Sequence, residues 1–152
     1  MIFLELAPIA KQLNEKTDQI NKILATVNRK LAKLNLGVTV WLDETLPAAP
    51  CRWIEDENGV RCRDAFYLGY GRLDDKWGLL VKNVTEEIKL DREGREYIEE
   101  IGPVRKASVL NGTRNARLAA LEQLPELLGV LKGKGERLLK LIDDAEETAQ
   151  AL

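Results

Sequence analysis

Two stretches of the chain repeat apolar residues in alternating steps of three and four. In the first stretch the repeating positions are Leu6, Ala10, Leu13, Thr17, Ile20, Leu24, Val27, Leu31 and Leu34. In the second they are Leu121, Leu124, Leu128, Leu131, Gly135, Leu138, Ile142, Ala145, Ala149 and Leu152. This spacing places the members of each series on one face of an α-helix. Each predicted helix therefore carries an apolar seam that needs a partner, which constrains the fold more than any other feature.

The first predicted helix covers residues 9–35 of an N-terminal segment, 1–36. Pro8 suits the opening turn of a helix, where its missing N–H costs nothing. Gly37 suits the stop at the other end. We therefore expect a helix about 40 Å long.

The second predicted helix covers residues 113–152, with Thr113 as a candidate cap. Pro125 interrupts the pattern while the heptad phase continues, so we expect either a kink or two abutting helices. Gly135 lies in the seam itself. We expect a neighbouring backbone to approach closely there, with a hinge as the alternative.

Between the helices, residues 37–104 are predicted to form strands. Apolar and polar residues alternate from Val38 to Asp43, which is typical of a half-buried strand. Leu46–Pro50 should interrupt the ladder, because proline cannot donate to it. The economical result is an antiparallel β-meander of four to six strands flanked by the two long helices. The fold class is α+β in a single domain.

Three turns are predicted within this meander. Asn58-Gly59 suits a type I′ turn, because such a turn needs two positive φ angles. Asp74-Asp75 should join two further strands. A hairpin over residues 91–94 is the third, although a helix over residues 92–101 is a rival interpretation.

Composition excludes several classes of function. The net charge of −2 argues against a dedicated nucleic-acid binder, which normally carries a basic stripe. No apolar run approaches the ~20 residues that span a bilayer. We therefore expect a cytoplasmic protein with no membrane partner, in which Cys51 and Cys62 are reduced.

The chemical inventory is poor. The chain has no histidine, and Ser108 is its only serine. Imidazole is therefore absent as a base or metal ligand, and hydroxyl nucleophiles are scarce. Cys51 and Cys62 have no further cysteine to complete a zinc site. We expect no enzyme, no metal and no cofactor, and an enzyme based on carboxylates or cysteine is the weakest alternative.

One candidate binding surface lies within residues 66–81, where glycines flank Tyr70 on a predicted strand. Glycines leave a strand face almost bare, so a ligand, a helix or another backbone can approach it. Arg72 and Lys76 flank the Asp74-Asp75 turn and are expected to reach the same face. The alternative is that the aromatic residues fill the core. The candidate ligand-binding residues are Tyr67, Tyr70, Arg72, Lys76 and Trp77.

The seams give the expected function, a non-enzymatic interaction or regulatory module that self-associates through coiled-coil-like helices. Its partner is a second copy of the chain or another protein. Two such helices paired as a hairpin would leave one flank for the sheet or another copy, and pairing in cis or in trans stays open. A protein that binds and sequesters a small anionic ligand or nucleotide is the alternative. The candidate interface residues are Leu13, Ile20, Leu24, Val27, Leu31, Leu128, Leu131, Gly135, Leu138 and Ile142.

Two motifs carry a resemblance. They are Leu68-Gly69-Tyr70-Gly71…Trp77-Gly78-Leu79 and Arg105-Lys106-Ala107-Ser108…Arg114-x-x-Arg117-Leu118-x-Ala120-Leu121-x-x-Leu124-Pro125-Glu126-Leu127-Leu128. Together they resemble a pattern of small uncharacterised bacterial proteins over about residues 65–130. The resemblance implies no activity and no site residues, only that the β segment and the following helix form one recurring unit.

Overall fold

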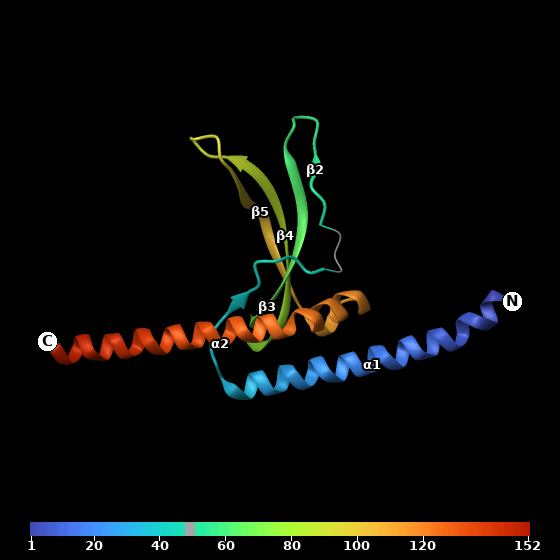
Figure 1. The fold of residues 1–152 in the computed structure, drawn as a ribbon, viewed down its shortest axis with the longest axis horizontal. Coiled ribbons are helices and arrows are strands. Elements are labelled where there is room, and N and C mark those ends of the chain that lie inside the picture. Colours follow the sequence, from blue (N-terminus) through green and yellow to red (C-terminus); the bar gives the residue numbers. More distant parts are fainter. Residues whose placement is uncertain (48–50) are drawn as a thin grey trace.

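The protein combines two long helices with one antiparallel sheet, so the α+β class is confirmed (Figure 1). The computed structural model describes residues 1–47 and 51–152. The part of the Leu46–Pro50 prediction that falls on residues 48–50 lies outside this description. In chain order the elements are α1 (Ile2–Leu34), β1 (Val40–Trp41), β2 (Ile54–Glu55), β3 (Arg61–Leu73), β4 (Lys76–Leu90), β5 (Glu96–Ser108), the 3-10 turn η1 (Val109–Asn111) and α2 (Arg114–Ala151).

Helix α1 begins at Ile2, so the prediction that Pro8 opens the helix is wrong. Pro8 lies inside α1 and removes one hydrogen bond, the one that the Leu4 carbonyl would accept. Leu4 is exposed, so water can satisfy that carbonyl. At the other end Asn35 is the C-cap, with a φ of 51° and its N–H on the Ala32 carbonyl at 3.2 Å. Gly37, with a φ of 65°, lies in the turn beyond.

Helix α2 begins at its predicted cap. The Thr113 hydroxyl accepts a hydrogen bond from the Ala116 N–H at 3.2 Å, which satisfies one of the free donors of the first turn. The helix then continues through Pro125 to Ala151. The alternative of two abutting helices is therefore wrong. In the part of the chain that the structure describes, neither helix offers a long enough apolar stretch to cross a membrane.

The sheet has the order β1-β3-β4-β5, and β2 also pairs with β3. Asp74 and Asp75 have φ angles of 50° and 64°, so the β3–β4 hairpin closes with two left-handed residues, as a type I′ turn requires. The predicted type I′ turn at Asn58-Gly59 is wrong, because only Gly59 has a positive φ. The Asp56 carboxylate bonds the N–H groups of Asn58 and Val60 instead and holds a different turn.

The third turn also closes a hairpin, so the helix proposed for residues 92–101 is wrong. Strand β5 runs from Glu96 to Ser108 and extends the sheet beyond residue 104. Asp91 caps the turn by accepting hydrogen bonds from the N–H groups of Glu93 and Arg95. Away from the helices, β3, β4 and β5 continue as an uncovered ribbon, with β2 paired to the outer end of β3 (Figure 1).

Both helices cover the same face of the sheet. Side chains alternate along a strand, so Leu68 and Tyr70 of β3 and Leu79 of β4 point toward the helices, whereas Tyr67 points the other way. The main core joins these residues to both helix seams. Its buried helical members are Leu24, Leu31, Ala119, Ala120, Leu124, Leu127 and Leu131.

The two helices run side by side in the same direction, so they do not form a helical hairpin. Arg114, at the start of α2, donates a hydrogen bond to Asn14 of α1 at 2.9 Å. Further along, Leu34 of α1 and Leu131 of α2 line one groove. All the strands lie between α1 and α2 in the chain. After crossing the sheet, the chain returns to the side on which α1 began, and α2 starts there. Pairing in cis is therefore parallel (Figure 1).

Because the helices are offset, each extends past the other. Residues 2–13 of α1 precede the start of α2 on one side, and we call them the α1 overhang. Residues 138–151 of α2 continue beyond the end of α1 on the opposite side, and we call them the α2 overhang (Figure 1).

Gly69 allows Trp41 to lie flat on β3. A Cβ at Gly69 would collide with the Trp41 ring and with the Val40 carbonyl oxygen. Of the three neighbours considered for this glycine-rich strand, a ligand, a helix or another backbone, the structure places the backbone and the Trp41 ring of β1 beside Gly69.

We expect Gly69→Ala to lower the free energy of unfolding by about 1–3 kcal/mol, because Trp41 and β1 must shift. Urea denaturation followed by tryptophan fluorescence measures this loss. Gly129→Ala is the matched control, since no atom lies within 4 Å of its Cβ position. It should gain up to about 1 kcal/mol from helix propensity. Equal stability of Gly69→Ala and the parent protein would show that the close approach is unimportant.

Candidate functional site

The middle of the predicted interface lies inside the chain's own core. Leu24, Leu31 and Leu131 are at most 6% exposed. Ile20 and Val27 are partly buried and pack against the same core. These five residues hold the helices on the sheet, so they are not free to form an interface with another protein.

Of the remaining predicted interface residues, all except the partly buried Gly135 are exposed. Leu13 and Ile142 are 47% and 55% exposed, and Leu128 and Leu138 are nearly 40% exposed. No atom lies within 4 Å of the Cβ position of Gly135. None of the described residues therefore makes the close backbone contact predicted at Gly135.

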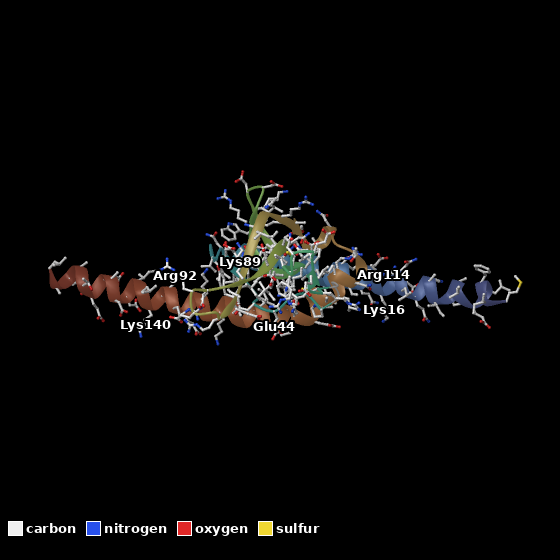
Figure 2. The ribbon with its side chains drawn as sticks, turned by 90° about the horizontal axis from the view of Figure 1, so that it is seen from above. Lys16, Glu44, Lys89, Arg92, Arg114 and Lys140 are labelled. Atoms are coloured by element: carbon white, nitrogen blue, oxygen red, sulfur yellow. The ribbon has the colours of Figure 1, made fainter. Side chains whose placement is uncertain are left out.

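The two overhangs carry further apolar side chains that the sequence analysis did not include. On the α1 overhang, Ile2, Phe3 and Leu4 are 65–76% exposed, and on the α2 overhang Leu139 and Leu141 are each 63% exposed. Lys16 and Lys140 mark the two helices on opposite sides of the sheet in Figure 2. The apolar run Ile2–Leu4 precedes Pro8, so a helix predicted to begin after Pro8 does not contain it.

An apolar groove leads from the body of the protein onto the α2 overhang. It has a volume of about 380 Å³ and lies where the end of α1 meets α2. Gly135 forms part of its floor, so the groove reaches the exposed seam. Its apolar lining residues are Leu31, Leu34, Leu36, Leu128, Leu131, Gly135 and Leu139.

The predicted ligand-binding residues do not form one surface. Arg72 pairs with Trp77 across the β3–β4 hairpin, and Leu73 pairs with Lys76. Cross-strand partners share a face, so Arg72 and Lys76 lie on opposite faces, and the expectation that they meet is wrong. Tyr67 also lies on the face opposite Tyr70.

Tyr70 belongs to the core. Its side chain is 1% exposed and stacks on Trp77, with 5.8 Å between ring centroids, and burial raises the pKa of its hydroxyl. Arg72 forms an exposed ion pair with Asp75 at 2.7 Å. The alternative that aromatic residues fill the core is confirmed for Tyr70.

Lys76 and Trp77 do line a groove, of about 580 Å³, where β5 leaves the sheet. Because β5 ends at Ser108, the Leu79 N–H has no strand partner, and the Asn28 side-chain oxygen accepts its hydrogen bond at 2.7 Å. Lys106 reaches the same groove from β5. The groove is thus lined by two lysines and Trp77, but Lys76 and Trp77 point to opposite faces of the sheet, and the Lys106 ammonium lies 5.7 Å from the centre of the Trp41 ring.

The face of the sheet away from the helices holds a polar cluster. Glu86 accepts hydrogen bonds from the Arg63 guanidinium at 2.8 Å and from the Tyr67 hydroxyl at 2.7 Å. Glu86 is 5% exposed, and the Tyr67 ring packs over Ala65 and Val84 to reach it. The sequence did not predict this cluster. Glu86 is the cross-strand neighbour of Arg63, and Tyr67, four residues further along β3, reaches it only through its long side chain.

Aromatic rings extend this cluster along the same face. Arg63 lies 4.3 Å from the centre of the Trp53 ring, and Lys82 lies 4.9 Å from that of Trp41. Cations over indole faces are stabilised by the ring quadrupole. Every charge of the cluster thus has a partner within the chain, so we assign it a structural role.

Tyr67 and Cys62 are poorly suited to act as proton acceptors or nucleophiles at neutral pH. Burial first, and then the hydrogen bond to Glu86, raises the pKa of Tyr67 to about 12. Partial burial, followed by Glu87 and Asp56, raises the pKa of the Cys62 thiol, so this thiol is largely protonated at neutral pH. Among the residues that the structure describes, no cluster of cysteine and carboxylate groups could hold a metal ion.

Comparison with known protein families, with curated protein sequences and with solved structures finds no match to this chain.

We expect Glu86→Ala to cost about 2–3 kcal/mol, because it leaves the Arg63 charge partly buried without a partner. Thermal or urea unfolding measures the loss. Glu100→Ala is the control, since its 3.7 Å pair with Lys82 is half exposed and should be worth less than about 0.5 kcal/mol. Similar losses for both variants would contradict a special role for Glu86.

Proposed function

We propose that the protein is a non-enzymatic interaction module that self-associates through α1 and α2. The observation that carries this proposal is the exposure of apolar side chains along both overhangs. Soluble monomers rarely expose contiguous apolar patches larger than a few hundred Å². In the part of the chain that the structure describes, most of each overhang lies beyond the sheet and beyond the other helix (Figure 1).

The energy available from covering these side chains supports the proposal. Burial of one Leu, Ile or Phe side chain contributes about 1.5–3 kcal/mol. The α1 overhang offers several such residues, among them Phe3, Leu6 and Ile9, and the α2 overhang offers Leu139 and Leu141. Burial of only part of them is enough to offset the cost of association, about 4–15 kcal/mol.

The seam is buried at Leu24 and exposed at Leu138 and Ile142, so we expect substitutions at these two places to have different effects. We expect Leu138→Glu and Ile142→Glu to lower the mass in solution to that of a single chain while the helical circular dichroism is kept. Leu24→Glu should instead unfold the protein, because Leu24 is fully buried against the sheet. Sedimentation equilibrium and circular dichroism give the two readouts.

Gln150→Glu is the matched control for these substitutions. It adds the same charge to the α2 overhang at a position outside the seam, and it should leave the mass unchanged. A parent protein that stays a folded monomer at high micromolar concentration would overturn the proposed function.

A second candidate function is the binding of a small anion or nucleotide in the groove at Lys76, Trp77 and Lys106. Two lysines and Trp77 line this groove at the edge of β4, and such side chains suit a charged ligand with a flat, stackable part. The observation in its favour is that β5 contributes a second lysine.

For this candidate we expect a nucleotide such as ATP to raise the melting temperature and to change the Trp77 fluorescence. Lys76→Ala combined with Lys106→Ala should abolish both effects without changing the stability of the free protein by more than about 0.5 kcal/mol. Arg72→Ala is the control, because Arg72 lies outside the groove and pairs with Asp75. A shift that survives the double substitution would exclude this groove as the site.

A further inference from the structure

We infer that the occupant of each overhang is the other overhang of a second copy, in a closed, two-fold symmetric dimer. In this dimer the α1 overhang of one chain packs antiparallel against the α2 overhang of its partner. The inference rests on the proposed self-association and names the segments that carry it.

The geometry of a single chain points to this pairing. The helices are parallel and offset, so the α1 overhang projects on one side and the α2 overhang on the other (Figure 1). A two-fold axis across the helices reverses this arrangement in the second copy. It therefore places the partner's α1 overhang beside the α2 overhang of the first chain, and the reverse pair forms at the other end.

The two overhangs match in length and in pattern. The α1 overhang has 12 residues, from 2 to 13, and the α2 overhang has 14, from 138 to 151. Both repeat apolar residues in alternating steps of three and four. Two helices with this pattern can pack their seams together over the whole shared length.

The groove at Gly135 provides room where the pairing meets the body of the protein. It is apolar and open, and it lies in line with Leu138 and Ile142 of the α2 seam. An antiparallel α1 overhang from the partner would bring its own seam, toward Leu13, into this region. A large side chain on the partner can thus fill the space that the missing Gly135 side chain leaves.

The orientation is also electrostatically favourable. The α2 overhang has Asp143, Asp144, Glu146 and Glu147 but no cation after Lys140. Antiparallel pairing places this acidic end near the positive N-terminal end of the partner's α1. Residues 2–13 of α1 carry only one carboxylate, Glu5, balanced by Lys11, so little repulsion opposes the contact.

The area suits a weak or transient dimer. A helix of 12 residues is about 18 Å long and about 10 Å wide, so each overhang presents a face of roughly 180 Å². The four faces in the two symmetry-related pairs of overhangs together cover roughly 700 Å², the size range of weak interfaces. Two other arrangements are less favourable. If only the two α2 overhangs paired, the α1 overhangs would stay in water. If copies were related by translation and not by a two-fold axis, they would form an open-ended chain.

Mixing two variants tests the pairing directly. The first variant carries Leu6→Glu and Leu13→Glu in the α1 overhang, and the second carries Leu138→Lys and Ile142→Lys in the α2 overhang. Each variant alone should be monomeric, with its dissociation constant raised about tenfold or more. An equimolar mixture should form mixed dimers, since one end keeps the original apolar contact and the other pairs Glu with Lys.

The control is the pair Gln12→Glu and Gln19→Glu, which adds the same charge to α1 outside its seam. It should leave the dimer unchanged, and circular dichroism verifies that all variants are folded. A dimer that persists in the α1 variant overturns this inference in favour of α2–α2 pairing while the proposed function stands. Failure of the mixture to dimerise also overturns it, as does a mass that grows beyond two chains. A monomeric parent protein overturns both proposals.

Discussion

The packing of two parallel helix seams on one face of the β3–β4 hairpin is the contact on which the rest of the structure depends. Leu24 and Leu31 of α1 and Leu127 and Leu131 of α2 share one core with residues of the hairpin such as Leu68. An isolated helix in water is only marginally stable. Burial of the apolar seam against the sheet provides the stability that helix propensity alone does not. Where this support ends, at the overhangs, the same seams face water.

Local patterns predicted the elements well, because each rests on interactions within a few residues. The heptad spacing identified both helices, Thr113 identified the start of α2, and Asp74-Asp75 identified a turn. The errors arose where two local signals competed. Pro8 predicts a helix start, but α1 already begins at Ile2. Asn58-Gly59 predicts a positive φ at Asn58, but the Asp56 carboxylate holds a different turn.

Long-range geometry was less predictable. The apolar seams do not determine whether the helices run parallel or antiparallel. That direction depends on how many times the intervening chain crosses the sheet. The candidate ligand surface was wrong for a related reason. Across a two-residue turn the paired residues, which share a face, are an odd number of positions apart. Arg72 and Lys76 are an even number apart, so they lie on opposite faces. The Glu86 cluster depends on the reach of Tyr67 over Ala65, which no motif encodes.

The uncovered ribbon formed by the outer parts of β3, β4 and β5 gives the molecule a gradient of local stability. Near the helices the strands share a core with Leu68 and Leu79, but toward the tips the side chains of Ile54, Leu90 and Ile98 are more than half exposed. Backbone hydrogen bonds there are backed mainly by surface ion pairs such as Arg61–Glu96. Amide hydrogens at the tips should therefore exchange with solvent through local fraying, while those beside the helices exchange only when the whole domain opens.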